Sequence, residues 1–95
     1  MFEEAMTAAK SLDEEFKRTG KLKGPLHGVP VSLKDNFGVA GKAGSVGFVG
    51  WANDPATSDS SMVALLKNLG AIVYVKTNVP TAMMIAETIN NLFGR

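Results

Sequence analysis

The sequence predicts an α/β fold in which short parallel strands are flanked by helices. A helical repeat of apolar residues spans residues 2–19, and a second one spans residues 59–69. The second repeat runs directly into a continuous apolar segment, residues 71–75, which is typical of a strand covered on both faces in a parallel sheet. With an earlier apolar segment at residues 29–33, this order of elements indicates a right-handed βαβ-like unit.

Residues 2–19 predict an amphipathic helix. Its apolar side chains recur at steps of three and four and fall on one face: Phe2, Ala5, Ala9, Leu12 and Phe16. Acidic residues lie near its start and basic residues near its end, as the helix dipole favours. Gly20 is expected to end the helix, because glycine readily adopts the left-handed conformation found after helix C-termini.

Residues 29–33 predict a short strand. Pro30 is expected at its start or on an edge, because proline lacks a backbone N–H. From residue 35 to residue 56 glycines recur through a long loop, with room for a brief strand at residues 37–39. These glycines do not lie between a strand and a helix start, so the loop does not predict a phosphate or nucleotide site.

Residues 59–69 predict the second helix, which Ser58 or Asp59 can cap and Gly70 ends. Its expected buried stripe is apolar: Met62, Leu65, Leu66 and Leu69. We expect this helix to pack on two adjacent, parallel strands. A turn follows the second strand, and then a short helix over residues 81–87.

The composition indicates one small globular domain or part of a larger one. The chain has 95 residues, of which 45% are hydrophobic, and a formal net charge of +1, so neither disorder nor a basic nucleic-acid surface is predicted. It has no cysteine, which excludes disulfides and thiolate chemistry. The start of the chain lacks a signal-peptide pattern and no apolar run reaches bilayer-spanning length, so a soluble, cytoplasmic protein is expected.

Lys34 is the residue most indicative of chemistry. It ends the apolar strand and is followed by the polar turn Asp35-Asn36. A strand-end lysine that loses much of its water can act as a neutral base near physiological pH. The alternative is a lysine whose ammonium group reaches solvent, as most lysines do. The sole histidine, His27, has no cluster of further ligands, so no metal site is predicted, and a loop histidine held by backbone hydrogen bonds is expected.

Several motifs occur along the chain in one order: GPLHGVPVSLKDN at residues 24–36, Gly44-Ser45, Asp59-Ser60, Gly70-Ala71, KTNVP at residues 76–80 and NLFG at residues 91–94. In this order and spacing the chain resembles the amidase signature family, serine hydrolases that use a Ser–Ser–Lys triad to hydrolyse carboxylic amides. It looks most similar to acetamidase-like and fatty-acid-amide-hydrolase-like members. The resemblance implies a partial amidase-signature fold, with residues 1–95 as a single incomplete domain from the N-terminal part of an amidase-signature domain.

The resemblance implies that Lys34 is the triad lysine and the one catalytic residue of this segment. It implies site-supporting positions near the ends of both strands: Asp35, Asn36, Thr77 and Asn78. It also implies that Met83 borders the acyl pocket and contacts substrate, although Met83 can equally fill a core. Core positions are favoured for Met84 or Ile85.

Both serines of the family triad lie in a glycine- and serine-rich segment that residues 1–95 do not contain. The pair Ser60-Ser61 opens a helix, where capping explains it better than nucleophilic chemistry. We therefore expect a segment that is inactive alone and has no cofactor, with an amide substrate bound only in the full-length parent. The alternative is a stand-alone, non-catalytic protein that self-associates or binds a partner. Unpaired strand edges also predict a homo-oligomer.

Overall fold

The computed structural model describes residues 1–95 and divides them into two compact units. Unit 1 comprises Met1–Ser32 and Ala64–Val75, and unit 2 comprises Leu33–Val63 and Lys76–Arg95. The regular elements are helices α1 (Phe2–Thr19) and α2 (Ser61–Asn68), strands β1 (Pro30–Lys34) and β2 (Ile72–Thr77), and short 3₁₀ turns at Val49–Trp51 and Thr81–Met83. No helix is both long enough and apolar enough to cross a bilayer.

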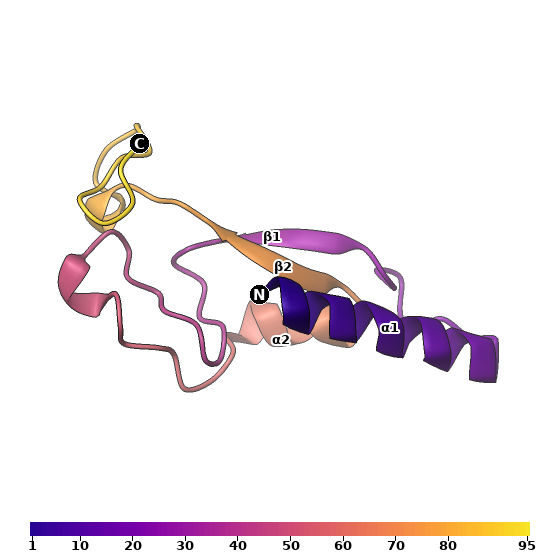
Figure 1. Cartoon of the computed structure of the whole chain (residues 1–95). Coiled ribbons are helices and arrows are strands. Elements are labelled where there is room, and N and C mark those ends of the chain that lie inside the picture. Colours follow the sequence, from indigo (N-terminus) through magenta and orange to yellow (C-terminus); the bar gives the residue numbers. More distant parts are fainter. The chain divides into compact units, whose positions relative to one another are not determined.

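The two strands are neighbours in one two-stranded sheet, and Figure 1 shows them side by side. The N–H of Ile72 donates to the carbonyl of Val29 at 2.8 Å, and the N–H of Asp35 donates to the carbonyl of Thr77 at 3.1 Å. The residue numbers rise in the same direction in both strands from the first of these hydrogen bonds to the second, so the strands are parallel, as predicted. Each strand begins one residue later than the apolar pattern indicated, and Pro30 takes the first position of β1, where its missing N–H is tolerated.

In unit 1, helix α1 spans the predicted residues and ends at Gly20, which has a φ of 69° and donates its N–H to Phe16. One face of α1 packs on β2 in a small core: Ala5, Leu12 and Ile72, with Ala9 and Tyr74 at its margin. Phe2 and Phe16, which the apolar spacing places on the same face, are 68% and 46% exposed. They lie near the two ends of α1, outside that core, where their rings face Tyr74 and His27.

The expected buried stripe of α2 is wrong at two positions. Met62 and Leu65 are each 51% exposed, whereas Val63 is fully buried. Leu66 is partly buried, one turn along from Val63, so the buried face is centred on the Val63 side of the helix. Both sides of this eight-residue helix carry apolar residues, so periodicity alone does not fix which side is buried.

In unit 2, the helix expected over residues 81–87 is replaced by the 3₁₀ turn Thr81–Met83. Ala82 and Met83 have φ values of 53° and 57°, a left-handed conformation that a right-handed helix cannot contain. The core positions favoured for Met84 or Ile85 are wrong, since these side chains are 80% and 56% exposed. Residues 37–39 likewise form no strand.

Candidate functional site

Lys34 is the last residue of β1, and the peptide group that follows it is held by two hydrogen bonds. Its carbonyl accepts a hydrogen bond from Phe37 N–H at 3.0 Å, and the N–H of the next residue, Asp35, donates to Thr77 at 3.1 Å. Alternation along β1 buries Leu33 and turns Lys34 outward, so its side chain is exposed. The expected loss of water around Lys34 is therefore not met within residues 1–95.

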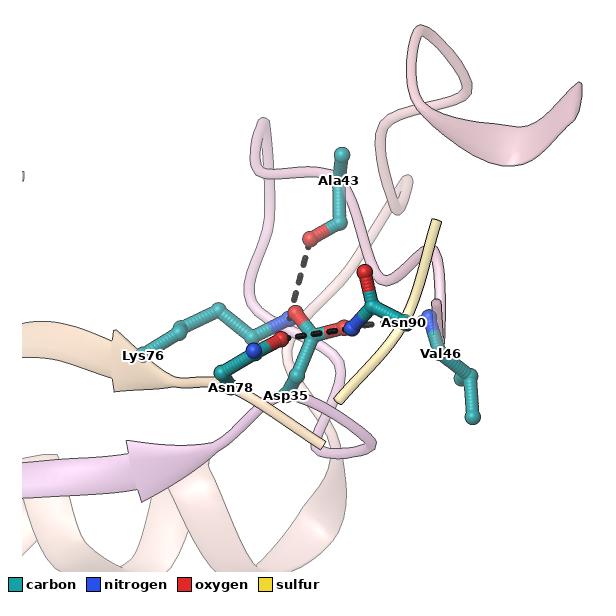
Figure 2. Close-up of polar contacts among 6 residues, drawn as sticks. All are labelled: Asp35, Ala43, Val46, Lys76, Asn78 and Asn90. Carbon is teal, nitrogen blue, oxygen red and sulfur yellow. Dashed lines mark hydrogen bonds and ion pairs between the residues drawn. The ribbon is translucent and has the colours of Figure 1, made fainter. Parts of the chain in front are cut away.

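The Asp35 carboxylate connects three segments of unit 2, as Figure 2 shows. Its Oδ2 accepts a hydrogen bond from the N–H of Val46 at 3.0 Å, and its Oδ1 lies 3.4 Å from Nζ of Lys76. The same Nζ donates to the carbonyl of Ala43 at 3.0 Å. The Lys76 and Asp35 side chains are 9% and 12% exposed, so the ion pair is shielded from water on most sides.

The loop that receives these bonds is strained and closely packed. Val46 has a φ of 51°, a left-handed value that is a true outlier for a β-branched residue. Its N–H donates to Asp35, and its carbonyl accepts a hydrogen bond from Ala82 N–H at 2.9 Å. Ser45, the preceding residue, is 2% exposed. Partners on both sides of Val46 therefore stabilise a conformation that the isolated residue disfavours.

Asn90 fixes the last loop of unit 2 to the end of β2. Its Nδ2 donates to the side-chain oxygen of Asn78 at 2.7 Å and to the carbonyl of Val79 at 2.6 Å. Its Oδ1 accepts hydrogen bonds from the N–H groups of Leu92 and Phe93 at 2.9 and 2.8 Å. Figure 2 draws the Asn78–Asn90 contact together with the Asp35–Lys76 pair, and these two sets of polar contacts hold the loops of this unit.

The structure brings together some of the residues that the sequence indicated. Asp35 and Thr77 meet through the backbone, and the side chain of Asn78 bonds to Asn90. Asn36 is an exposed residue of the turn after β1. Met83 is 42% exposed, which does not fit core filling.

Sequence reasoning missed Lys76 and Asn90. Lys76 carried a usable signal. It lies near the carboxyl end of β2, and Asp35 directly follows the carboxyl end of β1. Because the carboxyl ends of neighbouring parallel strands meet at one edge of the sheet, the two side chains could have been expected to pair. Asn90 carried none, since nothing local distinguishes it from Asn91.

His27 lies in unit 1. Its ring Nδ1 accepts a hydrogen bond from the backbone N–H of Lys23 at 2.9 Å, and its backbone N–H donates to the carbonyl of Gly24. This is the backbone-held loop histidine that was expected. No three His, Asp or Glu side chains gather in a way that could hold a metal ion.

Comparisons with known proteins point to one family. The profile of the Amidase family matches residues 1–95. Amidase 1 of Gibberella moniliformis is 50% identical over 93 residues, covering 98% of this chain and 18% of that protein. The acetamidase of Emericella nidulans is 43% identical over 91 residues, covering 96% of this chain and 17% of that protein.

Solved structures agree with these relatives. A fatty acid amide hydrolase superposes with a TM-score of 0.92 at 35% identity, covering 97% of this chain and 16% of that one. The peptide amidase of Stenotrophomonas maltophilia superposes with a TM-score of 0.74 at 37% identity, covering 83% of this chain and 16% of that one. The chain thus spans only 16–18% of the length of the proteins it matches. Because the profile matches from the first residue to the last, the chain belongs to the amidase family.

Proposed function

We propose that residues 1–95 form one incomplete domain, the lysine-bearing N-terminal part of an amidase that hydrolyses carboxylic amides through a Ser–Ser–Lys triad. The observation that carries this proposal is the setting of Lys34. It ends a strand, the peptide group between it and Asp35 is bonded to Phe37 and Thr77, and its exposed side chain is open to a partner group. The family match over the whole chain supports the same role.

In the proposed reaction the neutral amine of Lys34 is the base. It accepts a proton from a bridging serine, which in turn takes the proton of the nucleophilic serine as that oxygen attacks the amide carbonyl carbon. The lysine then helps return a proton to the nitrogen of the leaving amine. Both serines would come from parts of an amidase domain other than this segment, whose surroundings would also remove water from Lys34.

The supporting residues act through position. Asp35 and Asn36 form the turn that sets the direction of Lys34, and Thr77 holds that turn through its carbonyl. Asn78 keeps the end of β2 attached to the Asn90 loop. Met83, exposed on its 3₁₀ turn, borders the acyl side of the substrate in this proposal.

A chimera tests the function directly. Residues 1–95 replace the matching segment of the Emericella nidulans acetamidase, and hydrolysis of a simple aliphatic amide is measured. We expect activity that Lys34→Met lowers about 100- to 10,000-fold, the range for loss of a general base. Lys10→Met, which removes an exposed charge of α1, is the control and leaves activity unchanged.

The isolated chain should show no turnover, since a lysine without its serines forms no acyl intermediate. An active chimera that tolerates Lys34→Met would overturn the proposal. So would amide turnover by residues 1–95 alone that Lys34→Ala abolishes.

A stand-alone, self-associating protein is the second candidate. Many large apolar side chains are exposed, among them Phe2, Leu22, Trp51, Met84 and Phe93. Exposed apolar surface on this scale favours association with another protein surface, here a second copy of the chain.

A further inference from the structure

We propose that Lys76 is a positioning residue for Lys34, acting through Asp35. This inference rests on the proposed function, in which Lys34 is the base. Lys76 does not contact the reacting atoms in this scheme. It fixes the carboxylate of Asp35, the residue after Lys34, and so fixes the turn that adjoins the lysine.

The geometry gives the Asp35 carboxylate two separate anchors. One oxygen accepts the N–H of Val46 and the other faces the ammonium group of Lys76. The ammonium group also donates to Ala43, three residues before Val46. The ion pair therefore joins the turn after β1, the loop at residues 43–46 and the end of β2.

The loop at residues 43–46 lies close to this pair. A β-carbon on Gly44 would lie 3.6 Å from both Nζ of Lys76 and the carbonyl oxygen of Asp35, an ordinary van der Waals contact. The loop at residues 43–46 thus packs against the Asp35–Lys76 pair. A compact ammonium group with several donors suits a position where one nitrogen must reach a carboxylate and a carbonyl at once.

The strained backbone of Val46 depends on the Asp35 carboxylate, and so on the Lys76 that holds it. Its left-handed backbone persists only while its neighbours determine it, and the Asp35 carboxylate is one of those neighbours. Without Lys76, that carboxylate is buried without its counter-charge and tends to turn toward water. The turn at Asp35 and Asn36 would then shift and change the direction of the adjoining Lys34, while the hydrogen bonds of the rest of the sheet keep the protein folded. The expected result is a displaced Lys34 in a folded protein.

The test uses the acetamidase chimera with three variants. Lys76→Met removes the charge and keeps the aliphatic stem. Asp35→Asn combined with Lys76→Met removes both charges and keeps an oxygen for Val46. Lys10→Met is the control for loss of an exposed lysine. A fluorophosphonate that labels activated serines counts folded sites, and hydrogen exchange reports protection of the Val46 amide.

We expect Lys76→Met to lower kcat per labelled site about 10- to 100-fold, the effect of a misplacement of about 1 Å, with KM nearly unchanged. The Val46 amide should exchange faster, and the double variant should recover most of the lost kcat. A lower labelling end point with unchanged kcat per site would mean a structural role only and would overturn the inference. Unchanged Val46 exchange in Lys76→Met would overturn it as well.

Failure of the proposed function gives a different pattern. In that case Lys34→Met leaves the chimera active, whatever Lys76→Met does, and the inference falls with it. If the chimera shows no activity at all, exchange at Val46 still decides whether Lys76 anchors the loop. If Lys34→Met abolishes activity while Lys76→Met behaves like Lys10→Met, only the positioning role of Lys76 is refuted.

Discussion

Gly47 and Asn90 meet with no room for a side chain between them, since a β-carbon on Gly47 would lie 2.9 Å from the β-carbon of Asn90. Gly47 also has a φ of 79°, so Gly47→Ala adds both a contact and an unfavourable conformation. We expect this change to lower the free energy of unfolding by about 2 kcal/mol or more. Denaturant unfolding at one fixed protein concentration measures the loss.

Gly41 provides a matched control for that substitution. Its φ of 77° is nearly the same, but a β-carbon there would meet nothing within 4 Å. Gly41→Ala should therefore lower the free energy of unfolding by only about 1 kcal/mol, the effect of the left-handed conformation alone. Equal losses at the two glycines would show that the contact between Gly47 and Asn90 contributes nothing.

Asn90→Ala should be among the most destabilising polar substitutions in unit 2. It removes four hydrogen bonds from a side chain that is 6% exposed and leaves the carbonyl of fully buried Val79 without that donor. We expect a loss of about 2–3 kcal/mol in the free energy of unfolding. The amides of Leu92 and Phe93 should also exchange faster by NMR.

Asn91→Ala is the control, because the Asn91 side chain is exposed. It should change the free energy of unfolding by less than about 0.5 kcal/mol. If Asn90→Ala proves equally mild, the side-chain network that joins the loop to β2 is not a stabilising feature.

The parts of the fold that local physics determines were predictable. Helix α1 follows from apolar spacing and from Gly20, which stops it with a left-handed φ. The parallel strands follow from the apolar run after the second helix. The face of α2 was not predictable, because Val63 and Leu65 are both apolar and only the tertiary contacts decide which is buried. The turn at Ala82 and Met83 carries no glycine or asparagine to announce its positive φ values.

The candidate site divides in the same way. The place of Lys34 at a strand end was evident from sequence, and so was the turn that follows it. The partners of Asp35 were not, since its carboxylate bonds to Val46 and pairs with Lys76, both far from it in the sequence. That choice depends on the path of an irregular loop at residues 43–47, which no periodicity encodes.

Leu12 should contribute strongly to the stability of unit 1. It is 8% exposed and lies in the small core with Ala5 and Ile72. Leu12→Ala therefore removes apolar contacts and leaves a cavity in that core. We expect a loss of about 2–3 kcal/mol in the free energy of unfolding, near the low end for buried leucines because the core is small. Leu22→Ala, at a side chain that is 63% exposed, is the control and should be nearly neutral. Equal effects would mean that α1 does not pack on β2 as described.

The isolated chain should self-associate. Each strand of the two-stranded sheet has a partner on one side only, and open edges of this kind pair with other chains. A sheet of two strands is also marginal by itself, since small domains bury only about 60% of their unfolded surface. We therefore expect a two-fold dimer formed by edge-to-edge pairing of strands, in preference to exchange of α1 between copies.

Light scattering coupled to size-exclusion chromatography at micromolar concentration measures the mass. A mass above the 10.0 kDa of one chain is expected. Because strand pairing uses backbone groups, Met84→Lys combined with Ile85→Lys should leave that mass unchanged, although these side chains are 80% and 56% exposed. Dissociation of this double variant would place the contact on the apolar turn after β2 instead. A single species at the mass of one chain, folded by circular dichroism, would contradict self-association altogether, because the open edges and exposed apolar side chains would then be tolerated without a partner.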